Sequence, residues 1–382
     1  MRALWHYPIP IHWGAGAKDT LGKLLSATHE RVFLLAGKQA LEAGHVRRIQ
    51  QILRDYSQES VLCVLEVAGN LHQQHLDHAL SLYREEGGVL PLVALGGGSV
   101  LDAAKLIRAV GHHKIALEAV NELPESAEQP LLVAIPTTAG TGSEVTGRAA
   151  YVGGEKSSKQ SLISPALRPS AAVVDVELSQ SLPAHIIAST GFIALTQCIE
   201  AYCGVAEDPF ADAIALGAIE LIAAFFHKAV NEPDNLDARE AMLKAACMSG
   251  VASHKSRGVC TALAHALASV NDMHHGLACA MCLPAVLDFN RSAVAPRLAR
   301  IARLLGVRGG GDDVQTLAFE CASALRALRA QVGLASGLSE AGVDESLLPK
   351  LASYAFDDSA HEDNPRSCRK EDILSLLQSS MA

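Results

Sequence analysis

The chain has 382 residues, of which 49% are hydrophobic and 19% are charged, and its formal net charge at pH 7 is −9. A chain of this length can bury either the core of one long α/β domain or two separate cores, and two domains are the better expectation. The acidic balance disfavours nucleic-acid binding, which normally needs a basic stripe, and favours an enzyme that acts on small molecules.

Membrane attachment and secretion are not indicated by the sequence. The first sixteen residues lack a long apolar core behind a basic segment, and no later stretch reaches some twenty apolar residues without charge. The nine cysteines have no regular spacing, which indicates reduced thiols rather than a disulfide framework. Cys279 and Cys282 form a single C-x-x-C, and we expect both to be small buried apolar side chains. We therefore expect a cytoplasmic protein with no membrane partner.

Short apolar runs in the first half of the chain predict buried strands. They occupy residues 32–36, 61–67, 90–95, 131–135 and 171–175, with helix-length stretches among the first four. This alternation of strand and helix is typical of an α/β domain.

Helical periodicity dominates beyond about residue 183. Helices are expected at residues 184–203, 209–229, 236–254, 294–305 and 312–332, and further loops at 205–208, 309–312 and 333–344. The pattern divides the chain into a dinucleotide-binding domain at residues 1–180 and an all-helical catalytic domain at residues 181–382.

Two glycine-rich segments that follow predicted strands indicate a cofactor that carries phosphate. In GGGSVLDAAK, residues 96–105, glycines remove the side chains that would keep a pyrophosphate from the backbone, and the start of a helix supplies amide donors. In IPTTAGTGSEVT, residues 135–146, hydroxyl groups can donate as well. Asp102 and Lys105 lie one helical turn apart, where they could orient the loop or reach the cofactor.

These segments resemble the two nucleotide-binding signatures of the iron-containing (group III) alcohol dehydrogenases, relatives of glycerol dehydrogenase and maleylacetate reductase. The likeness continues through residues 169–183, 189–202 and 260–284 and the tripeptide NPR at 364–366. It implies a Rossmann-like α/β N-terminal domain followed by an all-α C-terminal domain, as in dehydroquinate synthase, with the active site in the cleft between them. It also implies a homodimer.

The resemblance places a nicotinamide dinucleotide on the first domain. The family usually carries an aspartate that binds the adenosine ribose at the position of Gly37, which Lys38 follows. Because that carboxylate would repel a 2′-phosphate, its loss makes NADP at least as well suited as NAD. The expected cofactor-binding residues are Gly37, Lys38, Asn70, Gly96, Gly97, Gly98, Ser99, Asp102, Thr137, Thr138, Thr141 and Ser143.

The resemblance also implies a divalent metal, and here the chain departs from the family. The four ligand positions hold Ile193, Gln197, Thr261 and His275, and only the last keeps the family's ligand. One imidazole and one neutral amide make a poor site for iron or zinc, so we expect no metal. The alternative is a rearranged zinc or iron site that combines His275 with other donors. Its candidate donors are His265, Cys198, Cys260 and His274.

Without a metal, hydride transfer needs a positioned proton donor, a cation or an activated substrate. His265 matches a histidine that lies near the nicotinamide in the family, and His275 matches the last ligand, so both are candidate proton donors. Lys159 matches a lysine that lines the family's cleft, and with Arg148 it fits an anionic substrate. His361, close to NPR, is a more distant option.

The sequence thus predicts a metal-independent oxidoreductase that moves hydride between NADP or NAD and a small alcohol or carbonyl compound, acting as a reductase. A nucleotide-binding protein that has lost catalysis is the alternative from another class. Two further alternatives are a dehydrogenase with the rearranged metal site and a lyase-like relative of dehydroquinate synthase.

Overall fold

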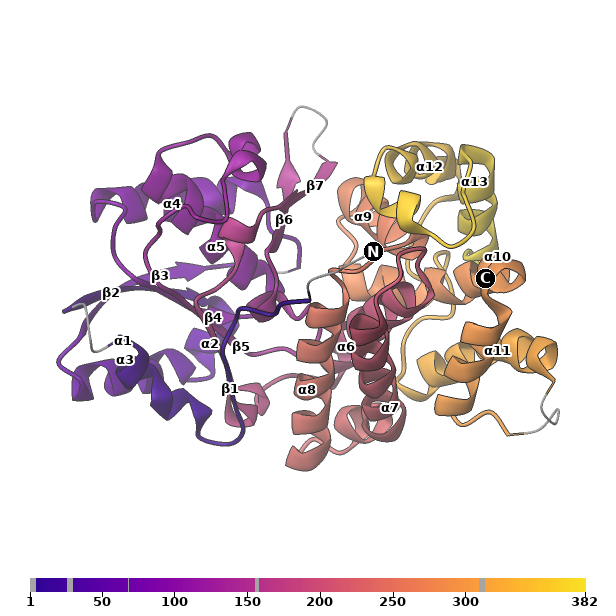
Figure 1. The fold of residues 1–382 in the computed structure, drawn as a ribbon, viewed down its shortest axis with the longest axis horizontal. Helices are drawn as coiled ribbons and strands as arrows, with labels where there is room; N and C mark the ends of the chain where they lie inside the picture. The colour runs from indigo at the N-terminus through magenta and orange to yellow at the C-terminus, as the bar shows by residue number, and fades with distance from the viewer. Residues whose placement is uncertain (1–4, 26–29, 68, 155–157, 309–312) are drawn as a thin grey trace. The chain divides into compact units, whose positions relative to one another are not determined.

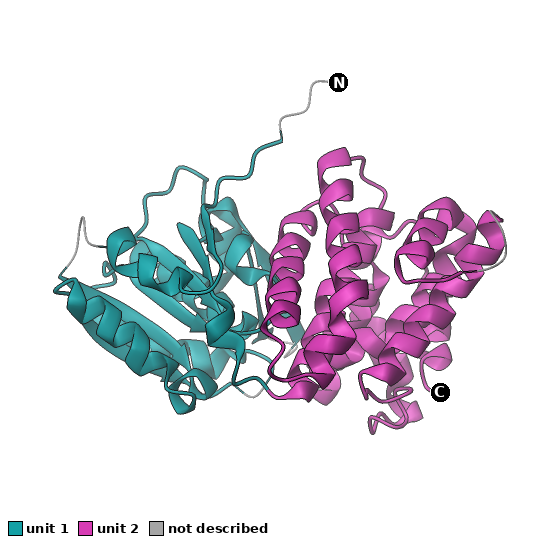
Figure 2. Cartoon of the chain, turned by 90° about the horizontal axis from the view of Figure 1, so that it is seen from below, with its two compact units in different colours: residues 1–138, 142–182 teal, residues 139–141, 183–382 magenta. Residues whose placement is uncertain are grey.

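The computed structural model describes residues 5–25, 30–67, 69–154, 158–308 and 313–382, so the loop expected at 309–312 lies outside the described residues. The chain divides into two compact units, shown in Figure 2. Unit 1 comprises residues 1–138 and 142–182, and unit 2 comprises residues 139–141 and 183–382. The expected α/β domain followed by an all-α domain is confirmed, and the division after residue 182 lies close to the boundary drawn from the sequence.

A parallel sheet of six strands lies at the centre of unit 1, in the order β1-β8-β5-β4-β2-β3 (Figure 1). Its strands are β1 (Ile11–Trp13), β2 (Arg31–Gly37), β3 (Glu59–Leu65), β4 (Leu92–Gly96), β5 (Leu132–Pro136) and β8 (Ala171–Val174). Every run expected to be a strand forms one. The sequence did not predict β1, which is short and lies at the edge of the sheet next to β8.

Helices cover both faces of this sheet. The helices of unit 1 are α1 (Leu21–Leu25), α2 (Lys38–Glu42), α3 (His45–Asp55), α4 (Gln73–Glu85) and α5 (Gly98–His113), with 3-10 turns η1 (Ala17–Thr20), η2 (Leu117–Glu122), η3 (Ser143–Val145), η4 (Pro165–Leu167) and η5 (Val176–Ser179). Alternate side chains of β2 enter opposite cores: Phe33 and Leu35 pack with residues of α4 and α5, whereas Val32 and Leu34 pack with residues of α1 and α3. Burial on both faces explains why β2 is a continuous apolar run.

An antiparallel hairpin follows the second glycine-rich segment. It consists of β6 (Arg148–Gly153) and β7 (Ser158–Ile163), and Val152 also forms a bridge with His72. Most residues of β7 are only half-buried, so the sequence lacks the apolar run that signalled the strands of the central sheet. The hairpin was therefore not predicted.

Every secondary-structure element in the described residues of unit 2 is a helix. Its elements are α6 (Ala184–Cys203), α7 (Pro209–Asn231), α8 (Leu236–Ala252), α9 (Val259–Asn271), α10 (His275–Leu304), α11 (Val314–Gln331), η6 (Glu345–Leu347), α12 (Leu348–Phe356), η7 (Ser359–Asp363) and α13 (Lys370–Ser379). The helix expected at residues 294–305 is present as the second part of α10, which consists of two helices joined across a kink at Val294. Pro296, two residues after Val294, explains the break, because proline cannot continue the hydrogen bonding of a helix.

Among the described residues, three helices of unit 2 are long and apolar enough to cross a membrane by length and composition: α6, α7 and α10. The sequence reading did not single them out. In α6, 89% of the most apolar window is buried inside the structure, compared with 61% in α10 and 39% in α7. Burial in the helical core accounts for the hydropathy of α6.

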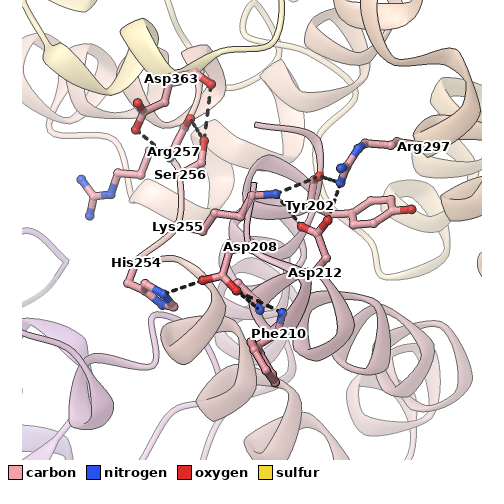
Figure 3. Close-up of polar contacts among 11 residues, drawn as sticks. Tyr202, Asp208, Phe210, Asp212, His254, Lys255, Ser256, Arg257, Arg297 and Asp363 are labelled. Atoms are coloured by element: carbon pink, nitrogen blue, oxygen red, sulfur yellow. Dashed lines mark hydrogen bonds and ion pairs between the residues drawn. The ribbon is translucent and has the colours of Figure 1, made fainter. Parts of the chain in front are cut away.

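A network of charged groups joins the elements of unit 2, as Figure 3 shows. The carboxylate of Asp212 on α7 accepts hydrogen bonds from Lys255 (2.5 Å) and from Arg297 of α10 (2.8 Å), and the guanidinium of Arg297 lies over the ring of Tyr202. The side chain of Lys255 is completely buried, so this pairing compensates its desolvation. The network fixes the segment that leads into α9.

Candidate functional site

The glycine turns of unit 1 lie at the carboxyl edge of the sheet, where its strand order reverses. The chain leaves β2 toward β3 on one side of β2 and returns with β4 on its other side. Such a switch point is where ligands bind in open α/β sheets. Strand β2 ends at Gly37 and β4 ends at Gly96, so two of the expected cofactor residues lie at this position.

Close packing explains the first glycine turn. A Cβ atom on Gly96 would lie 2.8 Å from Val100, and one on Gly97 would lie 3.3 Å from the side chain of Thr138. Gly97 caps α5 with extended backbone and no side-chain cap, so the helix begins at Gly98 with only backbone around its first amides. The turn is a cradle that a side chain would fill, and it fits a pyrophosphate.

The second segment is tied to the first. The amide of Thr137 donates to the carbonyl of Gly96 (3.0 Å), and the hydroxyl of Ser143 donates to Asp102 on α5 (2.5 Å). Thr141 belongs to the part of the segment that clusters with unit 2, where Gly140 packs against Thr190. Asp102, expected at the cofactor, thus contacts the neighbouring loop.

Asn70 and Lys159, which the sequence placed in the cofactor site and the catalytic site, lie together in unit 1. The ammonium of Lys159 on β7 donates to the side-chain oxygen of the buried Asn70 (3.0 Å). The hydroxyl of Ser99, in the first turn of α5, donates to the carbonyl of Gly69 (2.6 Å). The loop that carries Asn70 is therefore held at the start of α5.

Lys38 has an acidic partner that the sequence reading missed. Its ammonium forms a hydrogen-bonded ion pair with Glu66, which directly follows β3. The pairing of Gly37 with Leu65 in the sheet brings the two side chains together. The hydrogen bond that Lys38 donates to Glu66 raises the pKa of Lys38. A carboxylate therefore lies beside Lys38, the cation that follows the position of the family's aspartate.

In unit 2, the positions where the resemblance places metal ligands are engaged in other contacts. Ile193 is buried and packs against Gly276, where a Cβ atom would lie 3.0 Å from its side chain and 2.0 Å from the carbonyl of Ser189. The side-chain oxygen of Gln197 accepts a hydrogen bond from Ser249 on α8 (2.9 Å). The first pair of positions thus offers a hydrocarbon side chain and an occupied amide.

Thr261 is bound to a buried carboxylate on α6. Its amide and its hydroxyl donate to the two oxygens of Glu200, at 3.0 and 2.5 Å. Burial raises the pKa of Glu200, and the hydrogen bonds from Thr261 oppose that shift. This carboxylate holds the first turn of α9 and was not found from the sequence.

The donor set does not fit iron or zinc. Of the four positions only His275 supplies a strong ligand, whereas these metals need three or four donors. Across the described residues, no group of three or more histidine, cysteine, aspartate or glutamate side chains could hold a metal ion. The rearranged site around His275 is not formed there either.

His265 and His275 lie side by side, as candidate proton donors require. Their ring centroids are 5.2 Å apart, with His265 buried on α9 and His275 half-buried at the first residue of α10. The Nδ1 atom of His265 lies 2.6 Å from the Oδ2 atom of Asp358. Burial by itself raises the pKa of Asp358, but the hydrogen bond and the charge of His265 hold that pKa well below its usual range. A carboxylate therefore orients one ring nitrogen of His265.

The NPR tripeptide explains how Asp358 reaches α9. Asn364 exchanges side-chain hydrogen bonds with Asn290 on α10 (2.7 and 3.1 Å) and accepts one from the amide of Val259 (3.4 Å). Asp363, drawn in Figure 3, contacts the segment before α9 as well. Asp358 caps η7, which these contacts anchor, and its backbone carbonyl contacts His361. The sequence analysis missed Asp358, and its place shortly before NPR is the signal that could have found it.

Comparison with known families covers both units. The family described as "Iron-containing alcohol dehydrogenase" matches residues 8–176. The family described as "Fe-containing alcohol dehydrogenase family, C-terminal" matches residues 187–381. A probable alcohol dehydrogenase of Escherichia coli is 38% identical over 293 residues, which is 76% of this chain and 73% of that protein. The NAD-dependent methanol dehydrogenase of Bacillus methanolicus is 36% identical over 296 residues, covering 76% and 77%.

Relatives that align along nearly the whole chain give the same result. The 1,3-propanediol dehydrogenase of Klebsiella pneumoniae is 33% identical over 93% of this chain and 94% of its own length. The solved structure of a 1,3-propanediol oxidoreductase superposes with a TM-score of 0.91 at 30% identity, covering 99% of this chain and 100% of the other. On these matches, and on the glycine turns and helical unit described above, the chain belongs to the iron-containing alcohol dehydrogenase family.

Proposed function

We propose that this protein is an oxidoreductase that transfers hydride between NAD(H) and a small alcohol or carbonyl compound, works without a metal ion, and acts as a reductase. The observation that carries the proposal is the His265–Asp358 pair beside His275, in a helical unit whose other ligand positions hold Ile193 and hydrogen-bonded polar groups. The family is named for iron, so the metal-free mechanism is the part that most needs testing.

Two observations support NAD as the cofactor. The methanol dehydrogenase relative is named NAD-dependent. In this chain, Glu66 pairs with Lys38 at the edge of the sheet, which weakens the attraction of Lys38 for a 2′-phosphate. The absence of an aspartate at Gly37 by itself suits NADP. Glu66, directly after β3, supplies a carboxylate that offsets this effect.

The nucleotide would be held by residues of unit 1. The first-turn amides of α5 and the bare backbone of Gly96 and Gly97 suit a pyrophosphate, because no side chain stands between it and the helix start. Thr137 and Thr138 border this turn. A bound nicotinamide supplies or accepts the hydride.

His265 replaces the electrophilic help that a metal would give. Because its Nδ1 atom is hydrogen-bonded to Asp358, Nε2 is the nitrogen that would act on a reactant. In the reduction of a carbonyl, Nε2 delivers a proton to the oxygen while the carbon receives hydride, which yields the alcohol. Asp358 stabilises the charged imidazole before that transfer. His275, next to His265, helps to position the oxygen.

The substrate is a short carbonyl compound or its alcohol. Relatives are named for methanol and 1,3-propanediol, which are small. Because no Lewis acid polarises the carbonyl, an activated aldehyde or oxo acid suits this site better than a simple ketone, and reduction is favoured as the working direction. Lys159 favours an anionic group on that substrate. A cytoplasmic homodimer is part of the same proposal, and light scattering of the purified protein tests the dimer.

The decisive experiment combines turnover with metal analysis. We expect purified protein to oxidise NADH in the presence of some member of a panel of short aldehydes and oxo acids. We also expect much less than one equivalent of Fe or Zn per chain and no loss of rate after treatment with a chelator. One tightly held metal per chain with chelator-sensitive turnover would overturn the metal-free mechanism. Tight NADH binding without turnover on any substrate would favour the nucleotide-binding protein that has lost catalysis.

A further inference from the structure

Lys105, in the second turn of α5, is completely buried and fully engaged by protein acceptors. Its ammonium donates to the hydroxyl of Ser143 (2.6 Å), the hydroxyl of Thr146 (3.1 Å) and the backbone carbonyl of Arg148 (2.7 Å). An ammonium has three hydrogens, so these bonds use all of them. Lys105 therefore does not reach a ligand, although the sequence left that role open.

Asp102 extends the same set of contacts. Its Oδ1 atom accepts from Ser143 (2.5 Å) and lies 3.5 Å from the ammonium of Lys105, and its Oδ2 atom accepts from the amide of Ala150 (2.9 Å). One face of α5 thus holds the stretch from Ser143 to Ala150, which begins at the end of the second glycine-rich loop. We call these contacts the Lys105 network.

The Lys105 network and the glycine turn hold the two ends of the second loop. At the start of this loop, Thr137 is bonded to Gly96, and Thr138 packs against Gly97. At its end, Lys105 and Asp102 fix Ser143. Both ends of the loop are therefore held by α5 or by the glycine turn before it. The first turn of this helix would bind the pyrophosphate.

We propose that Lys105 is a positioning residue that sets the affinity for the nucleotide by locking the second glycine-rich loop against α5. The inference rests on the proposed nucleotide-dependent function. A preorganised loop lowers the ordering that binding would otherwise require, so loss of the lock weakens nucleotide binding without removing any contact to the nucleotide. The rate of hydride transfer at saturating nucleotide is affected less.

Titration adds a signature that a purely structural lysine would not give. Burial lowers the pKa of Lys105 to about 8, and Asp102 and Glu144 oppose that shift. The ionisable groups around the ammonium are Asp102 and Arg108 on α5 and Glu144 on η3. Because the neutral amine has one fewer hydrogen to donate, nucleotide affinity falls as the pH rises through about 8. A variant without the amine lacks this step.

The test is a fluorescence titration of the full-length protein with NADH between pH 6.5 and 9. We expect Lys105→Met to weaken NADH binding by about tenfold at pH 7 and to abolish the loss of affinity near pH 8. The matched control is Lys114→Met, which removes one charge from the exposed end of the same helix and leaves the affinity unchanged. Thr146→Val removes a single acceptor and gives a smaller loss, which keeps the test valid if Lys105→Met folds poorly.

A double-variant cycle separates positioning from direct contact. Because Lys105 and Ser143 belong to one network, Lys105→Met and Ser143→Ala together cost less affinity than the sum of the two single changes. The proposal is overturned if Lys105→Met binds NADH within twofold of the unmodified protein and keeps the same pH dependence. Failure of the unmodified protein to bind any nicotinamide dinucleotide would instead contradict the proposed function.

Discussion

The Nδ1 atom of His265 lies 2.6 Å from a carboxylate oxygen of Asp358, a residue that is 93 positions away in the chain. This pair stands in a family named for iron, in a chain whose ligand positions include a buried isoleucine, Ile193. An imidazole oriented by a carboxylate is a common means of delivering a proton where no metal assists. The pair is thus the most direct test of the proposed chemistry.

Changing Asp358 to Asn should separate catalysis from nucleotide binding. The amide can still contact His265 but no longer stabilises a charged imidazole, so we expect kcat for carbonyl reduction to fall by roughly a hundredfold or more. NADH affinity should stay within twofold. Asp357→Asn, at the exposed neighbouring position, is the control and keeps full activity. Equal kcat values in both variants would remove Asp358 from the mechanism.

The Thr261–Glu200 contact predicts a loss of stability upon removal of one hydroxyl. Thr261→Val keeps the backbone bond but deprives a buried carboxylate of its 2.5 Å donor, which costs about 1–3 kcal/mol of unfolding free energy. Thr196→Val is the matched control, because its buried hydroxyl makes no hydrogen bond within the described part of the chain. Denaturant unfolding should show the second variant as stable as the parent or slightly more stable. A similar loss in both would show that Glu200 does not need Thr261.

The Lys38–Glu66 pair predicts a measurable effect on cofactor choice. Glu66→Gln removes the carboxylate that neutralises Lys38, so we expect the ratio of kcat/KM for NADPH to that for NADH to rise by about tenfold. Glu59→Gln makes the same change of charge at the opposite end of β3 and should leave the ratio unchanged. The assignment fails if the two variants have the same ratio.

Glu144 predicts a specific dependence of stability on pH. Burial raises its pKa to about 7 from an ordinary value of 4.5. Because the folded state holds this proton more tightly than the unfolded chain, its contribution is complete below about pH 4.5 and is lost as the pH rises through 7. Glu144→Gln cannot ionise and should flatten that decline, by up to roughly 3 kcal/mol.

Unfolding free energies of both proteins, measured by denaturant titration from pH 4.5 to 7.5, check the expectation for Glu144. Glu85→Gln on the exposed side of α4 is the control and should keep the slope of the parent. Parallel curves for the parent and Glu144→Gln would show that this carboxyl does not titrate in the window.

The sequence predicted most of the fold because local patterns carry it. The run at residues 32–36 became β2, and the periodic stretch at 184–203 became α6 with the same limits. Strands without such patterns were missed: β1 is short and pairs with β8, and β7 is half-buried. In both strands, pairing with another strand decides the backbone, and no local pattern signals that pairing.

By itself, the sequence determined the glycine turns that predict a nucleotide site and the residues at the positions where the resemblance places metal ligands. The residue types at these positions do not depend on the fold: Gly96 and Gly97 have no side chain, and Ile193 has a hydrocarbon side chain. Only the tertiary structure decided which side chains complete the sites. Asp358 reaches His265, and Lys105 reaches Ser143, through pairings across 93 and 38 positions that packing brings together and that no local pattern encodes.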